Sequence, residues 1–400
     1  MKKVVAFILI LVLLIPGVTF AEDDPTPNAG SSILMEVSTK TILYEKNKDS
    51  QVAVASLTKM MAQILILEAI ESGNLTWDEQ VKASSNAAGY GGTQIYLQPG
   101  ETMSVRDLMK GITMASANDA TVVLAERIAG SEEAFVKMMN EKAQKLGLKN
   151  TNFMNPTGLD EDNHYSSAYD MALIAIELLK HDEILEFSSV YEDYLRTDTP
   201  NKFWLVNTNK LVRFYDGADG LKTGFTDNAG YTMAVTAKRN DMRLIAIVLG
   251  EAVSKVRNQE TTSLLDYGFN LYKVQVIKKQ GDVIKTVDLN KATKNKVDVV
   301  LDRDITVLSK KSDTEKSYTE KITIDEVKLP LKKNQVIGNI AIYDGTNKIG
   351  SYPLIVKEDV KKKNIFKLFF ERYCGRKLSI LDNISKILRR IILGIFCLLF

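Results

Sequence analysis

The sequence is dominated by one segment, Ala55-Ser56-Leu57-Thr58-Lys59-Met60-Met61, which places a serine and a lysine at the head of a long apolar run. Residues 60–70 are almost continuously apolar, so we expect a buried helix that begins at Ser56. One helical turn separates Ser56 from Lys59, which puts both side chains on the same face. A serine hydroxyl beside an amine base is a nucleophile for acyl transfer.

Two further motifs supply other parts of such a site. Lys222-Thr223-Gly224 occurs once and provides a cation that can hold a carboxylate. Ser-x-Asn occurs three times. The copy at Ser72 indicates a helix end, because Gly73 follows the apolar run, and the copy at Ser84 precedes a glycine-rich surface loop. Ser116-Ala117-Asn118 lies between two predicted helices, 105–114 and 120–129, which favours a loop presented to a cleft.

Together the motifs resemble the signature of the penicillin-recognising serine enzymes. Three segments narrow the resemblance to the serine D-alanyl-D-alanine carboxypeptidases, the low-molecular-weight penicillin-binding proteins: residues 55–61, Asn155-Pro156-Thr157-Gly158-Leu159 and Asp219-Gly220-Leu221-Lys222-Thr223-Gly224. The resemblance runs from about Ala29 to the C-terminus. It implies removal of the terminal D-alanine from peptidoglycan stem peptides through an acyl-enzyme at Ser56, acylation by β-lactam antibiotics, and no cofactor or metal.

We expect Ser56 to be the nucleophile and Lys59 its general base. A dry site and the charge of Lys222 would lower the pKa of Lys59 and so favour the neutral amine. By resemblance, Ser116 passes the proton to the leaving amine, and Asn118 hydrogen-bonds the substrate's backbone amide.

The remaining predicted site residues bind the substrate. By resemblance, Lys222 and Thr223 face the terminal carboxylate, and Gly224 lets the substrate lie along the strand edge. The backbone N–H groups of Ser56 and Phe225 form the oxyanion hole. Arg257, 35 positions after Lys222, matches a family arginine near the carboxylate; the alternative is a solvated arginine on a charged helix. The loop 89–92 is either a rim of the cleft or, by default, flexible surface.

Four segments are predicted. Residues 1–21 indicate a secretory signal peptide, because two lysines precede a short apolar run and small residues follow it. Residues 22–272 are expected to form an α+β domain of the penicillin-recognising fold, an antiparallel sheet flanked by helices, with strands near 33–37, 41–45, 231–237 and 242–249. Residues 273–358 alternate in short runs (283–287, 297–301, 322–324 and 337–342), which predicts a small all-β domain. Its expected role is that of a spacer.

Residues 359–400 predict a basic amphipathic tail. From residue 361 onward it carries ten lysines or arginines against two acidic residues, whereas the body is acidic, which disfavours a nucleic-acid partner. Apolar residues from Ile380 to Ile391 recur at helical spacing, so we expect a helix lying on anionic lipid at the outer face of the cytoplasmic membrane. The alternative is a helix packed on the domain. Both cysteines, Cys374 and Cys397, lie in this tail, so no disulfide framework is implied for the body.

Other functions fit less well. Endopeptidase activity on cross-links uses the same residues and stays open. A class A β-lactamase needs a Glu-x-x-x-Asn segment, which is absent between Glu126 and Glu192. The two histidines, His164 and His181, form no His-Glu-x-x-His motif for zinc and give a Ser-His-Asp triad little support. An inactive wall-binding protein would not need Ser56, Lys59 and Lys222.

Overall fold

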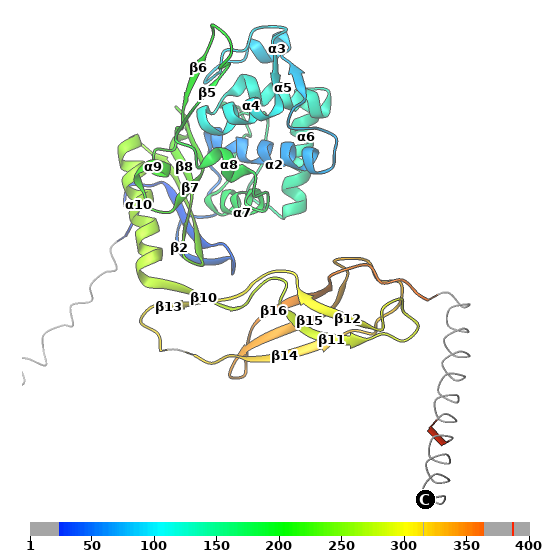
Figure 1. Ribbon diagram of the computed structural model, residues 1–400. Coiled ribbons are helices and arrows are strands. Elements are labelled where there is room, and N and C mark those ends of the chain that lie inside the picture. The colour runs from blue at the N-terminus through cyan, green and yellow to red at the C-terminus, as the bar shows by residue number, and fades with distance from the viewer. Residues whose placement is uncertain (1–23, 315, 364–385, 388–400) are drawn as a thin grey trace, which may run out of the picture. The chain divides into compact units, whose positions relative to one another are not determined.

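The structure, a computed structural model, describes residues 24–314, 316–363 and 386–387 (Figure 1). The chain divides into two compact units between Lys273 and Val274, one residue beyond the predicted boundary. The predicted signal peptide and nearly all of the predicted tail helix lie outside the described residues, so both stay predictions. Within the described part of the chain, no helix has the length and apolar character needed to cross a membrane.

The first unit is built around a five-stranded antiparallel sheet with the order β2-β1-β9-β8-β7. Both ends of this unit contribute to the sheet, because β1 near the N-terminus pairs with β9, with Ile33 opposite Ile247. The predicted strand pair and hairpin are therefore confirmed. The strands are β1 (Ser31–Glu36), β2 (Thr41–Lys46), β7 (Ala218–Thr226), β8 (Gly230–Arg239) and β9 (Met242–Glu251).

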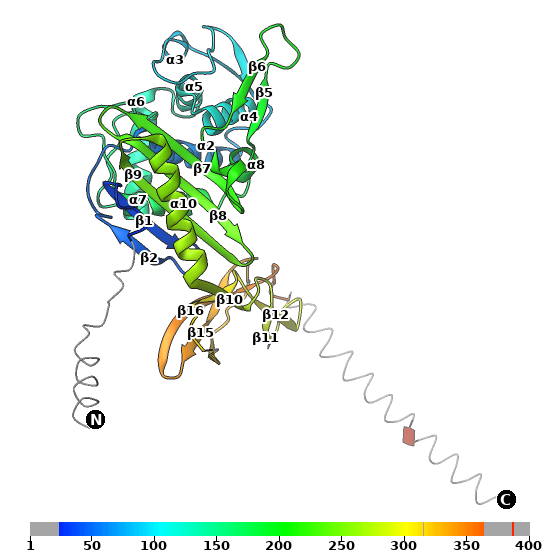
Figure 2. The same ribbon diagram turned by 90° about the vertical axis from the view of Figure 1, so that its left-hand side faces the viewer.

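Helices lie on both faces of this sheet, as Figure 2 shows with α10 (Ser254–Leu271) across the near face. Gly268 lets α10 approach closely, since a Cβ there would lie 2.7 Å from side-chain atoms of Leu34 and Leu244. The next residues along those strands, such as Ile33 and Ile245, belong to the large core on the opposite face. Successive strand residues thus serve different layers.

The core on that opposite face is formed mainly by helices from the middle of the chain. They are η1 (Ala55–Thr58), α2 (Lys59–Glu71), α3 (Ser85–Ala88), α4 (Val105–Lys110), η2 (Gly111–Ala115), α5 (Asn118–Ala129), α6 (Glu132–Leu146), α7 (Ala168–Leu178) and α8 (Ile184–Ser188). The short helix α9 (Leu211–Phe214) contributes no residue to this core. Two small antiparallel strand pairs, which the sequence did not predict, occur among them: β3 (Gln80–Lys82) with β4 (Thr102–Ser104), and the hairpin of β5 (Glu192–Leu195) with β6 (Phe203–Val206).

The second unit is all-β, as predicted, and has a hydrophobic core of its own. Its main sheet has the order β11-β12-β16-β15-β14, and β10 pairs with β13. Three strands, β10, β13 and β16, were not predicted. The strands are β10 (Tyr272–Lys278), β11 (Val283–Asp288), β12 (Lys296–Leu301), β13 (Ile305–Lys310), β14 (Thr319–Ile324), β15 (Val336–Asp344) and β16 (Asn347–Val356).

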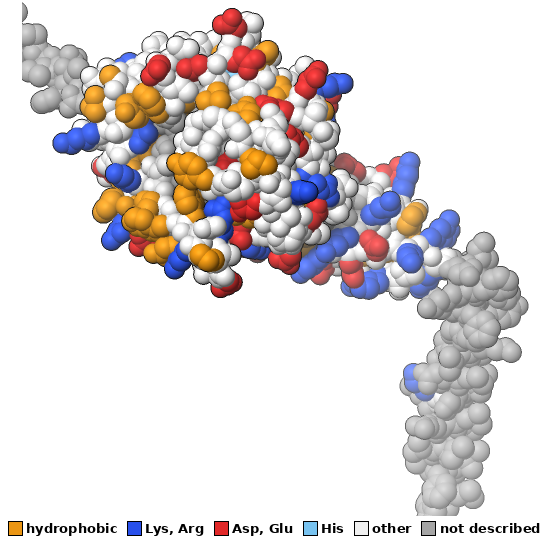
Figure 3. Space-filling model, turned by 90° about the horizontal axis from the view of Figure 1, so that it is seen from above, with side chains coloured by type: hydrophobic (Ala, Val, Ile, Leu, Met, Phe, Trp, Pro, Cys, Tyr) orange, Lys and Arg blue, Asp and Glu red, His pale blue; other side chains and the backbone are white. Residues whose placement is uncertain are grey.

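The face of the molecule in Figure 3 carries acidic and basic side chains interspersed, with hydrophobic side chains in patches between them. Charge on this face is therefore mixed, whereas nucleic acids are typically bound by a basic patch or stripe.

Candidate active site

Ser56 and Lys59 meet at the junction between η1 and α2. Ser56 lies in the 3-10 turn η1, and Lys59 is the first residue of α2. The regular helix therefore begins three residues later than predicted, and the tighter turn carries the serine. Lys59 Nζ lies 2.9 Å from Ser56 Oγ and donates to the carbonyl oxygen of Thr157 at 2.7 Å. The predicted nucleophile and base are thus in direct contact.

The surroundings of Lys59 favour its neutral form. The side chain is fully buried, and this burial is the main cause that lowers the pKa of Lys59 well below its ordinary value. The positive charge of Lys222 lowers this pKa further, while the carboxylate of Asp119 opposes both effects. A neutral amine can accept a proton, so the site meets the electrostatic requirement for a general base.

Ser116 is held in an unusual backbone conformation at the end of the π-helical turn η2. Its φ of 64° is left-handed, a region that few residues other than glycine adopt. The residue is buried, yet its Oγ has no hydrogen-bond partner among the described residues. No hydrogen bond joins Ser116 to Ser56 or Lys59 in that part of the chain. The hydroxyl is thus free to bond a ligand.

Asn118 begins α5 and is fixed by a neighbouring loop. Its Nδ2 donates to the carbonyl oxygen of Gly91 at 2.7 Å, and its backbone N–H donates to that of Thr93 at 2.7 Å. The loop after Gly89 therefore contacts the second motif, as a rim of the cleft would, and Gly91 is exposed, as a surface loop would be. Nothing in a run of glycines distinguishes these two cases.

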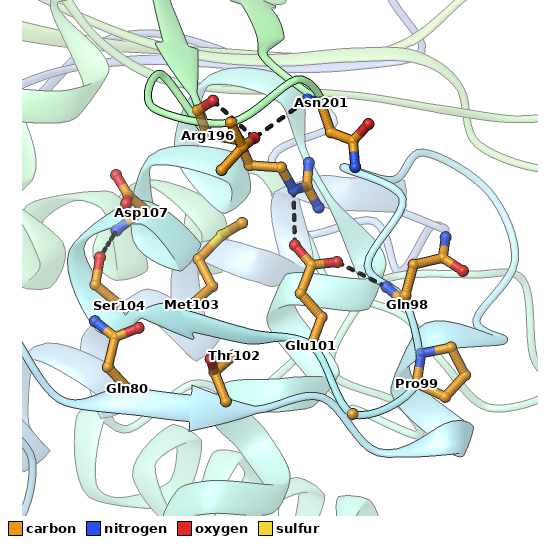
Figure 4. A pocket seen from close by; sticks show the side chains of 12 residues that line it. Gln80, Gln98, Pro99, Glu101, Thr102, Met103, Ser104, Asp107, Arg196 and Asn201 are labelled. Atoms are coloured by element: carbon orange, nitrogen blue, oxygen red, sulfur yellow. Dashed lines mark hydrogen bonds and ion pairs between the residues drawn. The ribbon is translucent and has the colours of Figure 1, made fainter.

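The same loop is held from two sides. The buried carboxylate of Asp119 accepts the backbone N–H groups of Ile95 and Leu97 at 3.1 and 3.0 Å. From the β5–β6 hairpin, Arg196 donates to the carbonyl oxygen of Ile95 at 3.0 Å and to Glu101 at 2.7 Å. Figure 4 shows the second pair beside a hollow of about 770 Å³. The residues lining that hollow belong to none of the three motifs.

The third motif lies on the edge strand β7 and faces the first. Gly224 is in close contact with the nucleophile turn, since a Cβ there would lie 2.8 Å from the backbone nitrogen of Ser56 and 2.6 Å from Thr232 Oγ1. Lys222 and Thr223 are buried, and Lys222 Nζ donates to the carbonyl oxygen of Thr223 at 3.0 Å. Burial and then the charge of Arg257 lower the pKa of Lys222 to about 7.

Arg257 is buried on α10, with only 6% of its surface exposed. Its guanidinium lies 5.9 Å from the ring of Tyr231 and donates to the carbonyl oxygen of Thr232 at 3.5 Å. The alternative of a solvated arginine is therefore wrong. Phe225 follows Gly224 with an exposed ring stacked on Tyr231, at 4.4 Å between centroids. The roles of Arg257 and Phe225 toward a substrate stay predictions.

Both histidines form hydrogen bonds with residues other than Ser56 and Lys59. His164 Nδ1 accepts the backbone N–H of Met154 at 3.2 Å, so Nε2 carries the proton and donates to Thr58 Oγ1 at 2.9 Å. Burial lowers the pKa of His164 to about 4. His181 Nδ1 pairs with Glu71. Among the described residues, no cluster of three or more histidine, cysteine or acidic side chains is arranged to hold a metal.

Comparison with protein families agrees with this geometry. Residues 18–253 match the family described as D-alanyl-D-alanine carboxypeptidase, and residues 272–362 match the C-terminal domain of penicillin-binding protein 5. The D-alanyl-D-alanine carboxypeptidase DacF of Bacillus subtilis (strain 168) is 42% identical over 94% of this chain and 98% of its own length.

Solved structures of penicillin-binding proteins are also similar to this chain. Penicillin-binding protein 5 of Haemophilus influenzae is 32% identical, with a TM-score of 0.67, over 84% of this chain and 98% of its own. Penicillin-binding protein D2 of Listeria monocytogenes, solved in its ampicillin-bound form, is 36% identical, with a TM-score of 0.55, over 60% of this chain and 98% of its own. The predicted fold of both units is confirmed by these likenesses.

Proposed function

This chain belongs to the D-alanyl-D-alanine carboxypeptidase family of serine peptidases, and we propose that it removes the terminal D-alanine from peptidoglycan stem peptides. The observation that carries the proposal is the 2.9 Å contact between Ser56 Oγ and a buried Lys59 amine. A lysine base that burial keeps neutral is what activation of a serine without a histidine requires.

In the first half of the reaction, Lys59 takes the proton of the Ser56 hydroxyl as Oγ attacks the carbonyl carbon of the penultimate D-alanine. The backbone N–H groups of Ser56 and Phe225 stabilise the oxyanion. Ser116, whose hydroxyl has no partner among the described residues, gives its proton to the nitrogen of the departing D-alanine and receives the one that Lys59 took from Ser56. Asn118 binds the amide of the peptide.

The terminal carboxylate of the substrate identifies the peptide end. Lys222, Thr223 and Arg257 form the cationic end of the site, and the two charges are close enough that Arg257 lowers the pKa of Lys222. A carboxylate placed between them relieves this repulsion, which favours binding of a free C-terminus.

Water completes the cycle by hydrolysing the acyl-enzyme. β-Lactams acylate Ser56 in the same way, and the lack of a Glu-x-x-x-Asn segment supports slow release of the drug. Endopeptidase cleavage of cross-links is the alternative, because it uses the same catalytic residues.

The proposed location is the outer face of the cytoplasmic membrane. The signal-peptide pattern of residues 1–21 supports export, and the basic amphipathic pattern of residues 361–400 supports attachment to anionic lipid. The second unit, which has its own core and carries none of the three motifs, serves as a spacer.

Release of D-alanine from a tripeptide ending in D-Ala-D-Ala tests the proposal, using residues 22–360. We expect release by the wild type and none by Ser56→Ala. The control is Ser84→Ala, which alters the first residue of another Ser-x-Asn copy. Cleavage of a cross-linked dimer without release from the tripeptide would establish the endopeptidase, and hydrolysis of neither substrate by folded protein would refute the proposal.

A further inference from the structure

The turn Asn155-Pro156-Thr157-Gly158 has no part in the chemistry described so far, yet it contacts the first motif directly. The carbonyl oxygen of Thr157 accepts a hydrogen bond from Lys59 Nζ at 2.7 Å. Gly158 is packed against the nucleophile turn, since a Cβ there would lie 1.9 Å from the carbonyl oxygen of Ala55. Farther along the same loop, His164 bonds Thr58. The loop is thus a wall of the site.

A single buried side chain holds this turn in shape. Asn155 Oδ1 accepts hydrogen bonds from the backbone N–H groups of Thr157, Gly158 and Leu159, at 3.2, 2.8 and 3.2 Å, and from the Thr157 hydroxyl at 3.1 Å. Its Nδ2 donates to the carbonyl oxygen of Leu159 and to Glu161. Only 6% of Asn155 is exposed. One amide group therefore fixes the direction in which the Thr157 carbonyl points.

We infer that Asn155 is a positioning residue for Lys59, acting through the carbonyl group of Thr157. A neutral amine has two N–H bonds and one lone pair. When one N–H is held by Thr157, the amine no longer rotates freely about its Cε–Nζ bond, and its lone pair is available to the Ser56 hydroxyl 2.9 Å away. In the acylation step the O–H bond of Ser56 breaks and an N–H bond forms on Lys59.

The turn also keeps water away from the amine. Gly158 has a φ of 82° and no room for a side chain, so the turn lies directly against η1. If the turn opens, water reaches Lys59 Nζ, and burial, the main cause of the low pKa of Lys59, is weakened. Loss of Asn155 is therefore expected to change both the rate of acylation and its dependence on pH.

Apart from Glu161, the charged groups around Lys59 keep their contacts in such a variant. Lys222 on β7 and Asp119 on α5 act on its pKa in opposite directions. On the loop itself, Asp160 accepts from Thr226 on β7 and His164, with a pKa of about 4, is neutral at ordinary pH. Glu161 loses its contact with Asn155 and is the one acidic group that the substitution frees.

The test compares acylation of Ser56 by a fluorescent penicillin in the wild type, Asn155→Ala and Asn207→Ala. Asn207 is the matched control, a buried asparagine that fixes another turn by accepting from the N–H of Asn209 and donating to the carbonyl oxygens of Ser188 and Val190. For Asn155→Ala we expect acylation to fall by about 10²-fold, and the acidic limb of its pH profile to move to higher pH. For Asn207→Ala we expect lower thermal stability, and we expect the acidic limb of the pH profile of acylation to stay where it is in the wild type.

Asn155→Asp keeps the proposal testable if Asn155→Ala does not fold. The aspartate retains the oxygen that accepts from the turn, so we expect acylation at the high-pH plateau to stay within about tenfold of the wild type. A folded Asn155→Ala that acylates at the wild-type rate with an unmoved limb would overturn the inference. So would a folded Asn155→Asp whose plateau acylation falls by about 10²-fold, the loss expected for Asn155→Ala.

The inference rests on the proposed function. The two can nevertheless be refuted independently, because different measurements test them. Acylation by penicillin reports on Lys59 and Ser56 whatever the natural substrate is. Normal acylation without release of D-alanine from the tripeptide would refute the carboxypeptidase and leave the role of Asn155 standing.

Discussion

Lys59 and Lys222 are both buried, and their amines are hydrogen-bonded to neutral groups. Lys59 Nζ donates to a hydroxyl and a backbone carbonyl, and Lys222 Nζ donates, within the part of the chain that the structure describes, to the carbonyl oxygen of Thr223. Neither burial is favourable for a charged amine, which is why the pKa of each is lowered. The site is therefore expected to reduce the free energy of unfolding, a common property of active sites.

We predict that Lys222→Met stabilises the protein while abolishing carboxylate binding. The pKa of Lys222 is about 7 in the folded protein, against 10.5 for an ordinary lysine side chain, so the unfolded chain binds the proton more tightly. The destabilisation is full below pH 7 and fades as the pH rises toward 10.5. The variant should be more stable at pH 6 by roughly 2–5 kcal/mol, a gain that shrinks at pH 9, as measured by denaturant unfolding.

The exposed Lys238 on β8 provides the control. Lys238→Met should change stability little at either pH, because its amine is already in water. A Lys222→Met protein that is less stable than the wild type at pH 6 would contradict the prediction.

Among single residues, the sequence was sufficient to predict which side chains the structure brings together, while their catalytic roles stay predictions. Ser56 and Lys59 are in contact, Gly224 lies against Ser56, and Arg257 acts on Lys222. The backbone groups that bind these side chains were not predictable. Every residue has a carbonyl group, so the sequence does not show that the one of Thr157 accepts a hydrogen bond from Lys59. Asp119, directly after Asn118, was a signal that was overlooked.

At the scale of elements, β7 and η1 approach each other through a glycine. We predict that Gly224→Ala lowers acylation by about 10²-fold or more, since the added Cβ pushes β7 away from the Ser56 N–H and separates the two halves of the oxyanion hole. The rate of acylation by a fluorescent penicillin measures this effect. Gly30→Ala is the control, because a Cβ there meets only ordinary contacts at 3.5 Å and beyond; equal losses in both variants would contradict the explanation.

Most strands with continuous or alternating apolar residues were predicted, although β10 and β13 were not. The pair β8 and β9 was found because its apolar residues are continuous. β16 escaped prediction because Gly350 and Pro353 interrupt its pattern. The hairpin of β5 and β6 has only four residues in each strand, and it is fixed by distant partners, such as Arg196 with Glu101. Such long-range contacts cannot be read from local periodicity.

For the whole molecule, each of the two units has a hydrophobic core of its own. We predict that residues 22–400 bind vesicles containing anionic lipid and that residues 22–360 do not, because the ten cationic residues from position 361 onward are missing. Co-sedimentation measures binding, which should weaken with added salt and be weaker on vesicles of neutral lipid. Equal binding by the two proteins would refute attachment through the tail.

The backbone contact at Gly224 and Gly158 has a consequence for natural selection by penicillin. Each position excludes even a methyl group, and Gly158 also needs a left-handed backbone. Substitutions that confer resistance to the drug are therefore not expected at these two glycines. We expect variants selected in the presence of antibiotic to accumulate instead at exposed positions such as Phe225, where a new side chain alters the fit of the drug without displacing the nucleophile.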